Sequence, residues 1–276
     1  MGNPTTEHGL GQARPTERIE AMSEATFGRV IEDVDLASLG EDRAGWLRET
    51  VATHGVVAFR NQTLDDEGFA RVMRLLGPLV FTPGETPVDG MPDLNVVSNV
   101  GRTTPPRSVW HTDSSYFSEP PAFTALRAVT VPESGGATLF SDQYRAADRL
   151  DADLRARLVG RNVRHRVSGL EDQDGESRHP LLRRHPVTGR TALFLSTPER
   201  CDAIDGYEDG EAQALIADLY AMSTADEVFR HVWQPGDVVM WDDRSTLHKA
   251  DHSAVVGDRV MHRAMVAGEK PVAAAA

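Results

Sequence analysis

Trp-His-Thr-Asp-Ser-Ser, residues 110–115, places an imidazole and a carboxylate two positions apart. In an extended segment, residues i and i+2 project to the same face, so His111 and Asp113 can reach one metal ion together. The pair alone is weak evidence, because a chain with 10 His and 42 acidic residues contains such pairs by chance. Taken by itself, a polar turn after a strand is the better interpretation.

A second polar cluster near the C-terminus changes this balance. It contains Trp241-Asp242-Asp243-Arg244, then His248, then Arg259-Val260-Met261-His262-Arg263. Two His and one carboxylate, with open positions left on the metal, form the ligand set of non-haem Fe(II) oxygenases. Together, the two clusters favour a metal site.

The composition is that of a soluble globular protein, with 40% hydrophobic and 26% charged residues among 276. Lys plus Arg is 29 and Asp plus Glu is 42, so the formal net charge is −13. This acidic balance argues against non-specific binding to nucleic acid or to an anionic membrane. Cys201 is the single cysteine, which excludes an intrachain disulfide and fits a cytoplasmic location. No apolar run approaches membrane-spanning length. We also expect a homo-oligomer, either a dimer or a tetramer.

Short apolar segments bounded by Gly and Pro turns run through most of the chain without alternating regularly with helical segments. The pattern argues against a doubly wound parallel sheet and predicts a mainly β fold with flanking helices, as a barrel or jelly-roll sandwich. We expect residues 1–16 to form a mobile arm, 17–271 a single domain, and the Ala-rich 272–276 a disordered tail. A polar stretch without apolar period, Gly169–Pro180, is predicted to be a mobile lid.

Apolar spacing and turn residues predict the individual elements. The predicted helices are Glu41–Thr53, a segment that starts near Thr63, one or two within Asp142–Val159, and Glu211–Met222. The predicted strands are Ile19–Met22, Gly28–Ile31, Val56–Phe59, Leu94–Val97, Phe123–Val131, Thr138–Phe140, Val163–Val167, Leu181–Arg184, Thr191–Leu195, Val228–Trp233, Asp237–Trp241 and Val260–Ala267.

Several motifs, in their order and spacing, resemble the taurine dioxygenase/TfdA family of Fe(II)- and 2-oxoglutarate-dependent oxygenases, from about Val56 to Pro271. One such motif is weak evidence, whereas the series is specific. The resemblance implies a double-stranded β-helix (jelly-roll) core and an enzyme that uses Fe(II), 2-oxoglutarate and O2. The motifs are Trp110–Asp113, Pro132–Leu139, Arg184–Gly189, Trp233–Asp237, Trp241–Arg244 and Met261–Ala264.

The resemblance also assigns the metal and cosubstrate residues. His111, Asp113 and His248 match the iron ligands. Thr138 and Arg259 match the pair that binds the distal carboxylate of 2-oxoglutarate. A guanidinium offers a planar fork suited to a carboxylate, and Thr adds a hydroxyl donor.

Arg263 matches a second active-site Arg that faces either the cosubstrate or a substrate anion. Arg259 and Arg263 are an even number of residues apart on a predicted strand, so both should point to the face opposite His262. The alternatives are a surface role for Arg259 and Arg263, and β propensity as the reason for Thr138. We expect the other histidines to be hydrogen-bonded structural residues: His165, His179, His185, His231, His252 and His262.

The sequence departs from the taurine enzyme where that enzyme recognises its substrate. Thr82 stands in place of a His that binds the sulfonate, and Arg107 replaces an Asn four residues before His111. Taurine is therefore not the expected substrate. Thr82, Arg107 and Arg263 are the predicted substrate-binding residues, and the two arginines suggest a substrate with a carboxylate.

The predicted function is oxidation of a C–H bond in a small organic acid, with release of succinate and CO2. The outcome can be hydroxylation, desaturation, epoxidation or ring expansion. A biosynthetic intermediate is one candidate substrate. A zinc-dependent hydrolase with the same three ligands is an alternative, but it gives Thr138 and Arg259 no role. A non-catalytic jelly-roll binding protein is the second alternative.

Overall fold

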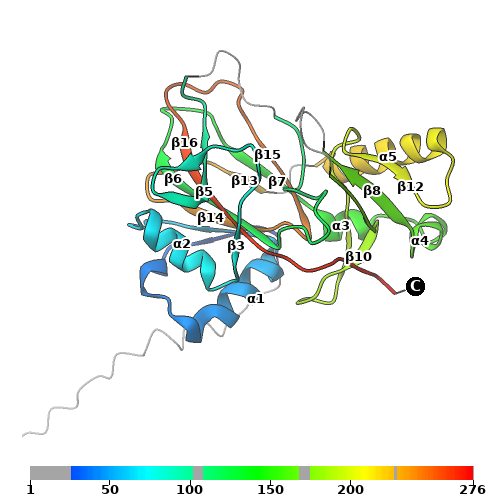
Figure 1. The fold of residues 1–276 in the computed structure, drawn as a ribbon, viewed down its shortest axis with the longest axis horizontal. Coiled ribbons are helices and arrows are strands. Elements are labelled where there is room, and N and C mark those ends of the chain that lie inside the picture. Colours follow the sequence, from blue (N-terminus) through cyan, green and yellow to red (C-terminus); the bar gives the residue numbers. More distant parts are fainter. Residues whose placement is uncertain (1–25, 102–107, 168–174, 227–228, 276) are drawn as a thin grey trace, which may run out of the picture.

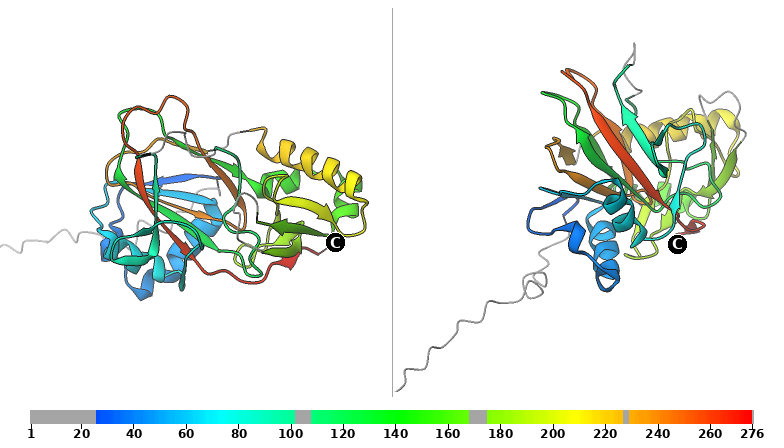
Figure 2. Two further views of the ribbon diagram at one scale, coloured as in Figure 1. Left: turned by 45° about the horizontal axis from the view of Figure 1, so that its top comes forward. Right: turned by 60° about the vertical axis from the view of Figure 1, so that its left-hand side comes forward.

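The computed structural model describes residues 26–101, 108–167, 175–226 and 229–275. Over these ranges the chain is mainly β with a few helices, as predicted. Figure 1 shows a large sheet on one side of the molecule and a smaller helix-containing part on the other, and Figure 2 shows both from two more directions. No described helix is both long and apolar enough to cross a membrane. The predicted arm (1–16) and first predicted strand (19–22) lie outside the described residues.

The large sheet has eight strands. They are β1 (Arg29–Ile31), β2 (Val56–Phe59), β3 (Leu79–Val80), β4 (Pro87–Val88), β5 (Met91–Ser98), β6 (Phe123–Thr130), β14 (Val238–Asp242) and β16 (Val260–Val266). Their order is β1-β2-β14-β6-β16-β5-β4, with β3 paired to β16. Only the β1–β2 pair is parallel among these pairings; the others are antiparallel.

Helices cover one face of this sheet (Figure 1). Two short 3-10 turns, Leu36–Ser38 and Glu41–Arg43, lead into α1 (Ala44–His54), and α2 (Asp66–Arg74) follows β2. The Asp65 carboxylate caps α2 by accepting a hydrogen bond from the Gly68 amide at 2.8 Å. The apolar side chains of both helices pack against the sheet in one core that includes Leu47, Val57, Phe59, Phe69, Met73 and Leu94.

A three-stranded sheet packs near the opposite face of the large sheet. It consists of β13 (Phe229–His231), β7 (Thr138–Asp142) and β15 (Thr246–Ala250), in that order. Phe140 of β7 lies 5.5 Å from Trp241 of β14 between ring centroids, within a second apolar core shared by the two sheets. β2 is apolar at all four positions because its alternating side chains fill both cores. β15 had no counterpart among the predicted strands.

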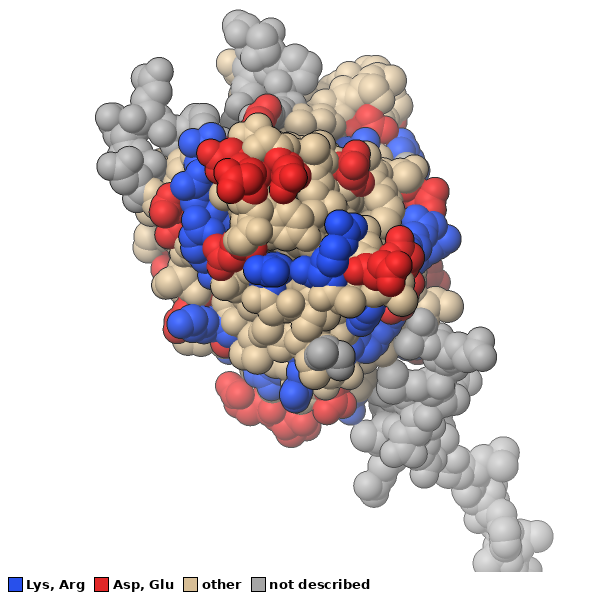
Figure 3. Space-filling view, turned by 90° about the vertical axis from the view of Figure 1, so that its right-hand side faces the viewer, with Lys and Arg blue, Asp and Glu red and all other residues tan. Residues whose placement is uncertain are grey.

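The smaller part combines helices with two three-stranded sheets, β12-β8-β9 and β11-β10-β17, around a separate apolar core. The face in Figure 3 belongs to this side, and its basic and acidic side chains are interspersed. Where this face is described, it therefore offers no continuous basic surface for a phosphate backbone. The elements are α3 (Gln143–Asp148), α4 (Ala152–Leu158), β8 (Asn162–Arg166), β9 (Glu176–Pro180), β10 (Leu182–Arg184), β11 (Thr191–Leu193), β12 (Cys201–Ile204), α5 (Asp209–Thr224) and β17 (Val272–Ala273).

Two predictions for this part were wrong. The second half of the predicted lid is strand β9, which pairs along its length with β8; residues 168–174 of the lid lie outside the described residues. The predicted disordered tail contains β17, which pairs with β10 and is followed by the buried Ala274. In both segments, backbone hydrogen bonds order a stretch whose composition has no strand pattern.

Candidate metal and cosubstrate site

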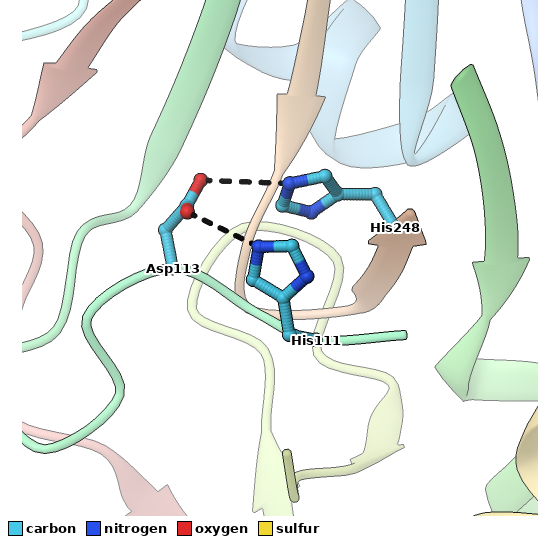
Figure 4. A group of neighbouring side chains, drawn as sticks. All are labelled: His111, Asp113 and His248. Atoms are coloured by element: carbon cyan, nitrogen blue, oxygen red, sulfur yellow. Dashed lines mark ion pairs between the residues drawn. The ribbon is translucent and has the colours of Figure 1, made fainter. Parts of the chain in front are cut away.

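Backbone pairing brings the two sequence clusters together. His111 forms an antiparallel bridge with His248 of β15. The His111 amide donates to the His248 carbonyl at 3.0 Å, and the His248 amide donates to the His111 carbonyl at 2.9 Å. The two imidazole rings lie 4.3 Å apart between centroids. Asp113 projects toward both rings, as Figure 4 shows.

The three side chains converge without hydrogen bonding to one another. Nε2 of His111 lies 3.8 Å from Oδ1 of Asp113, and Nε2 of His248 lies 3.8 Å from Oδ2 (Figure 4). A hydrogen bond would bring N and O to about 2.7–3.2 Å. One potential ligand atom from each residue lies within 4.8 Å of the other two. This spacing leaves room for a cation between two imidazoles and one carboxylate, a combination suited to Fe(II).

Hydrogen bonding around the triad (His111, Asp113 and His248) leaves one Asp113 oxygen without a partner among the described residues. Nδ1 of His111 lies 2.9 Å from the Val109 carbonyl oxygen. That contact places the proton on Nδ1 and directs the Nε2 lone pair toward Asp113. Oδ2 of Asp113 is buried and has no hydrogen-bond partner among the described residues. A buried carboxylate oxygen is costly without a partner, so its surroundings fit a bound cation.

The charge states of the triad also suit a divalent metal. Burial lowers the pKa of His111, and burial together with His111 lowers the pKa of His248 to about 3. Both imidazoles are therefore neutral at neutral pH, the form that binds metal. Burial opposes ionisation of Asp113, but the charge of His248 where it is protonated in acid, of Arg263 and of protonated His111 outweighs burial and lowers the pKa of Asp113 to about 2. The triad thus carries one negative charge.

Asp243 is a buried carboxyl group behind the triad that the sequence analysis did not assign. Thr124 donates to its Oδ2 at 2.6 Å, and the Trp241 indole donates to its Oδ1 at 3.1 Å. The Asp243 carbonyl accepts a hydrogen bond from the Thr112 hydroxyl at 3.0 Å. Burial and the neighbouring Asp113 raise the pKa of Asp243. Asp243 therefore joins the turn after β14 to the segment that carries two triad residues.

Arg259 and Thr138 lie together, as the resemblance implies. The Arg259 guanidinium donates to the Thr138 hydroxyl at 3.4 Å and to the Gly136 carbonyl at 3.0 Å. Gly136 adopts a φ of 70°, and a Cβ there would lie 3.0 Å from the Arg259 side chain. This close approach and the positive φ both favour glycine.

The charge of Arg259 is not balanced by any described carboxylate. Its side chain is 2% exposed, and burial lowers its pKa to about 10. No ion pair to Arg259 occurs within the ranges that the structure covers. A buried cation without a counter-charge is costly, which makes this position suited to an anionic ligand.

Arg263 occupies a different environment four residues further along. Its guanidinium lies 3.4 Å from Oδ1 of Asp113 and 3.0 Å from Oε1 of Glu85. His262 instead faces the helical layer, where Nδ1 lies 2.6 Å from the Asp66 carboxylate. The predicted orientation of Arg263, opposite to His262, is therefore confirmed.

The predicted substrate residues are only partly placed. Thr82 is buried, and its hydroxyl lies 3.0 Å from the Ser114 hydroxyl, directly after Asp113. Arg107 lies outside the described residues. The structure adds Arg200, which no motif indicated. Arg200 lines a pocket of about 110 Å³ beside the triad, together with Val109, His111 and Thr197.

His179 hydrogen-bonds to the Ser115 and Phe117 carbonyls, and His165 contacts the Cys201 thiol. Three other histidines are paired with acidic residues. In these acid pairs a ring nitrogen lies within hydrogen-bonding distance of the carboxylate, whereas the Nε2 atoms of the triad lie 3.8 Å from the Asp113 oxygens. The pairs are His185–Asp242 at 3.0 Å, His231–Asp237 at 2.9 Å and His262–Asp66 at 2.6 Å.

Comparisons with known proteins agree with the site. Residues 18–265 match the family described as taurine catabolism dioxygenase TauD, TfdA family. The chain is 33% identical, over 90% of its length and 94% of the relative's, to the (S)-phenoxypropionate/alpha-ketoglutarate-dioxygenase of Sphingobium herbicidovorans. It superposes with a TM-score of 0.80, at 32% identity, on a putative alpha-ketoglutarate-dependent taurine dioxygenase from Burkholderia xenovorans, covering 90% and 91% of the two chains.

A second solved structure, AAD-2 in complex with Mn(II) and N-oxalylglycine, gives a TM-score of 0.78 at 27% identity and covers 89% of this chain and 96% of its own. Family match, sequence identity and backbone similarity all extend over most of the chain. The chain therefore belongs to the TauD/TfdA family of 2-oxoglutarate-dependent dioxygenases.

Proposed function

We propose that the chain uses Fe(II), 2-oxoglutarate and O2 to oxidise a C–H bond of a small carboxylate-bearing molecule, with release of succinate and CO2. The observation that carries the proposal is the buried Arg259, a cation without a described counter-charge, next to Thr138 and close to the triad. A zinc hydrolase would need the triad and a water molecule, and it would leave this cation without a function.

His111, Asp113 and His248 would hold the iron. The buried Asp113 oxygen without a partner and the two neutral imidazoles fit such an ion. Bound iron supplies the oxygen chemistry, together with the cosubstrate. The residues of this chain hold the ligand geometry, and Val109 and Asp243 keep the ligand-bearing segment in position.

Arg259 and Thr138 would bind the far carboxylate of 2-oxoglutarate. Thr138 pairs with Ala250 across the β7–β15 ladder, and Phe140 pairs with His248. Thr138 and Phe140 therefore share one face, on the order of 7 Å apart along the strand. A five-carbon dicarboxylate has a comparable length, so one end can reach Arg259 while the other lies near the triad.

The substrate's carboxylate would bind beside His111, where Arg200 and Thr197 line the pocket. A guanidinium and a hydroxyl together suit an anionic oxygen. Thr82 and Arg107 remain proposed substrate-binding residues on the evidence of the sequence. Hydroxylation, desaturation and epoxidation all remain compatible with this arrangement.

We further propose that the large sheet and the β13-β7-β15 sheet together form the double-stranded β-helix, or jelly-roll, core. The apolar cluster between the two sheets supports this proposal. In this fold the triad would lie at one end of the sandwich, where β15 meets the segment after His111.

The test is succinate release by the iron-loaded protein with 2-oxoglutarate, across a panel of carboxylic acids and their matched amides. The proposal predicts succinate that depends on iron and increases with one or more acids, but not with the corresponding amides. Hydrolysis of an ester or amide by a zinc-loaded protein, without consumption of 2-oxoglutarate, would contradict it.

A further inference from the structure

Asn95, on strand β5, has a buried amide side chain without bonding partners. The residue is 0% exposed, and neither its Oδ1 nor its Nδ2 has a hydrogen-bond partner among the described residues. A buried carboxamide without partners destabilises the fold, so such a group calls for an explanation. Asn162 of β8 is the ordinary case, because its Nδ2 donates to the Asp205 carboxylate at 3.0 Å.

Strand register places Asn95 beside Arg263. The two residues are paired directly across the antiparallel β5–β16 ladder, so their side chains share one face of the sheet with Cβ atoms about 4.5–5.5 Å apart. Leu94 and Val96, on either side, pack in the core under the helices, whereas Val97 packs in the core between the sheets. This alternation puts the Asn95 side chain on the inner face, which also carries Arg263.

The inner face at this level belongs to the site. A terminal nitrogen of Arg263 lies 3.4 Å from the Asp113 carboxylate. Nε of Arg263 and Oδ2 of Asp113 are, like the Asn95 amide, buried atoms without a hydrogen-bond partner among the described residues. Neighbouring residues therefore present an open guanidinium donor, an open carboxylate oxygen and an open carboxamide. Asp113 would be completed by the metal, which leaves Asn95 and Arg263 for another ligand.

The level of Asn95 along the sheet separates it from the far carboxylate of 2-oxoglutarate. Arg259 directly precedes β16, four residues before Arg263, which is on the order of 13 Å along an extended strand. Asn95 is level with Arg263, so a ligand group that reaches it lies at the triad end of the site.

We propose that Asn95 is a ligand-binding residue, whose side-chain nitrogen donates a hydrogen bond to a ligand carboxylate held beside Arg263. The inference rests on the proposed function, because it concerns the same site. An amide donor next to a guanidinium gives a carboxylate a neutral and a charged partner on one face. Two molecules can supply this carboxylate: 2-oxoglutarate, through the end near the triad, or the organic acid that is oxidised.

The test measures folding stability and ligand affinity in the same variants. Asn95→Leu keeps the size of the side chain and removes both polar atoms, whereas Asn95→Asp keeps its shape and adds a negative charge. Asn162→Leu is the matched control, because Asn162 has a protein partner and lies in the smaller part of the molecule. Mn(II)-loaded protein is titrated calorimetrically with 2-oxoglutarate, and protein saturated with both is then titrated with 2-phenoxypropionate.

We expect stability and affinity to change in opposite directions. Without ligand, Asn95→Leu should unfold at the wild-type temperature or higher, because the chain loses no hydrogen bond, whereas Asn162→Leu should unfold at a lower temperature. With ligand, Asn95→Leu should weaken carboxylate binding about tenfold or more, because a hydrogen bond to a charged group is lost. Asn95→Asp should weaken it further through like-charge contact. Asn162→Leu should bind both ligands within about twofold of wild type.

The two titrations identify the source of the carboxylate. Weaker binding in the first titration assigns Asn95 to 2-oxoglutarate, and weaker binding in the second alone assigns it to the organic acid. The inference is overturned if Asn95→Leu leaves the first titration unchanged and the second is unchanged or shows no binding to wild type. It is overturned equally if Asn95→Leu lowers the unfolding temperature as Asn162→Leu does, which would make Asn95 a structural residue. A wild type that binds no 2-oxoglutarate would instead contradict the proposed function, whatever the residue at position 95.

Discussion

Two clusters in this molecule each place a buried carboxylate beside histidine but differ in how the groups are bonded. In the triad, two His nitrogens lie 3.8 Å from the Asp113 oxygens. In the cluster around Asp242, the His185 nitrogen lies 3.0 Å from Oδ2, and Arg244 donates to both Asp242 oxygens at 2.8 and 2.6 Å. Asp242 and Asp113 are both buried, yet both oxygens of Asp242 have partners.

The difference separates a ligand set from a structural ion-pair network. The Asp242 cluster is closed, because His185 and Arg244 compensate its charge and lower its pKa against burial. The triad is open, because an Asp113 oxygen has no partner among the described residues. Asp242 and His248 lie on consecutive strands, β14 and β15, that belong to two different sheets, so proximity in the sequence does not distinguish the two environments. Hydrogen-bond lengths and buried atoms without a partner distinguish them.

The largest expected effect is the loss of metal from the open cluster. His111→Ala, Asp113→Ala and His248→Ala should each abolish stoichiometric iron binding, because each removes one of three protein ligands. Iron content after gel filtration measures this directly. His185→Asn is the matched control in the closed cluster and should retain iron. Wild-type iron content in any triad variant would remove that residue from the ligand set.

Breaking the closed cluster should affect stability instead of metal binding. Asp242→Asn removes the buried counter-charge of Arg244 and leaves it only the more exposed Glu269, at 3.4 Å. Removal of one partner from a buried pair costs about 3–5 kcal/mol. Urea unfolding measures the free energy. Asp93→Asn, in an exposed ion pair, should change it by less than about 1 kcal/mol. A small decrease in the free energy of unfolding for Asp242→Asn, together with loss of iron, would contradict the distinction between the two clusters.

The third test concerns Arg259, a buried cation that lacks, among the described residues, the carboxylate partners of Arg244. Arg259→Gln should raise the apparent constant for 2-oxoglutarate by roughly 30-fold or more, since an unpaired charge in a desolvated site costs about 2–5 kcal/mol. Iron binding should persist. Thr138→Val removes one hydroxyl and should have a smaller effect. If 2-oxoglutarate binds Arg259→Gln as it binds wild type, the cosubstrate carboxylate lies elsewhere.

The smallest expected effect is a pH dependence of the metal-free protein. The pKa of His248 is about 3 in the folded protein, against about 6.5 in an unfolded chain. The unfolded state therefore binds more protons as the pH falls below about 6.5, and folding stability decreases over that range. Unfolding free energies at several pH values measure the slope. His248→Gln should make it shallower, and an unchanged slope would contradict the low pKa of this residue.

The sequence predicted His111 and Asp113 as a pair because they are neighbours, and the resemblance added His248; the structure places all three within 4.8 Å of one another. Sequence reasoning gave no strand to His248, since Arg244-Ser245-Thr246 is a polar turn, and β15 is formed by pairing with β7 and His111. The sequence did not indicate a role for Glu85 or Asp243 for a similar reason. An acidic residue in a turn has no periodic pattern, and its partners lie more than a hundred residues away in the chain. The tail was misjudged because backbone pairing of β17 to β10 does not depend on composition.

The most direct test of the account is the release of labelled CO2 from carboxyl-labelled 2-oxoglutarate by iron-loaded protein. Wild type and His185→Asn should both release CO2 in an iron-dependent manner, Arg259→Gln should do so only at much higher 2-oxoglutarate concentrations, and Asp113→Ala should release none. CO2 release by Asp113→Ala at the wild-type rate, or its absence from iron-loaded wild type, would contradict the assignment of the open cluster as the catalytic metal site.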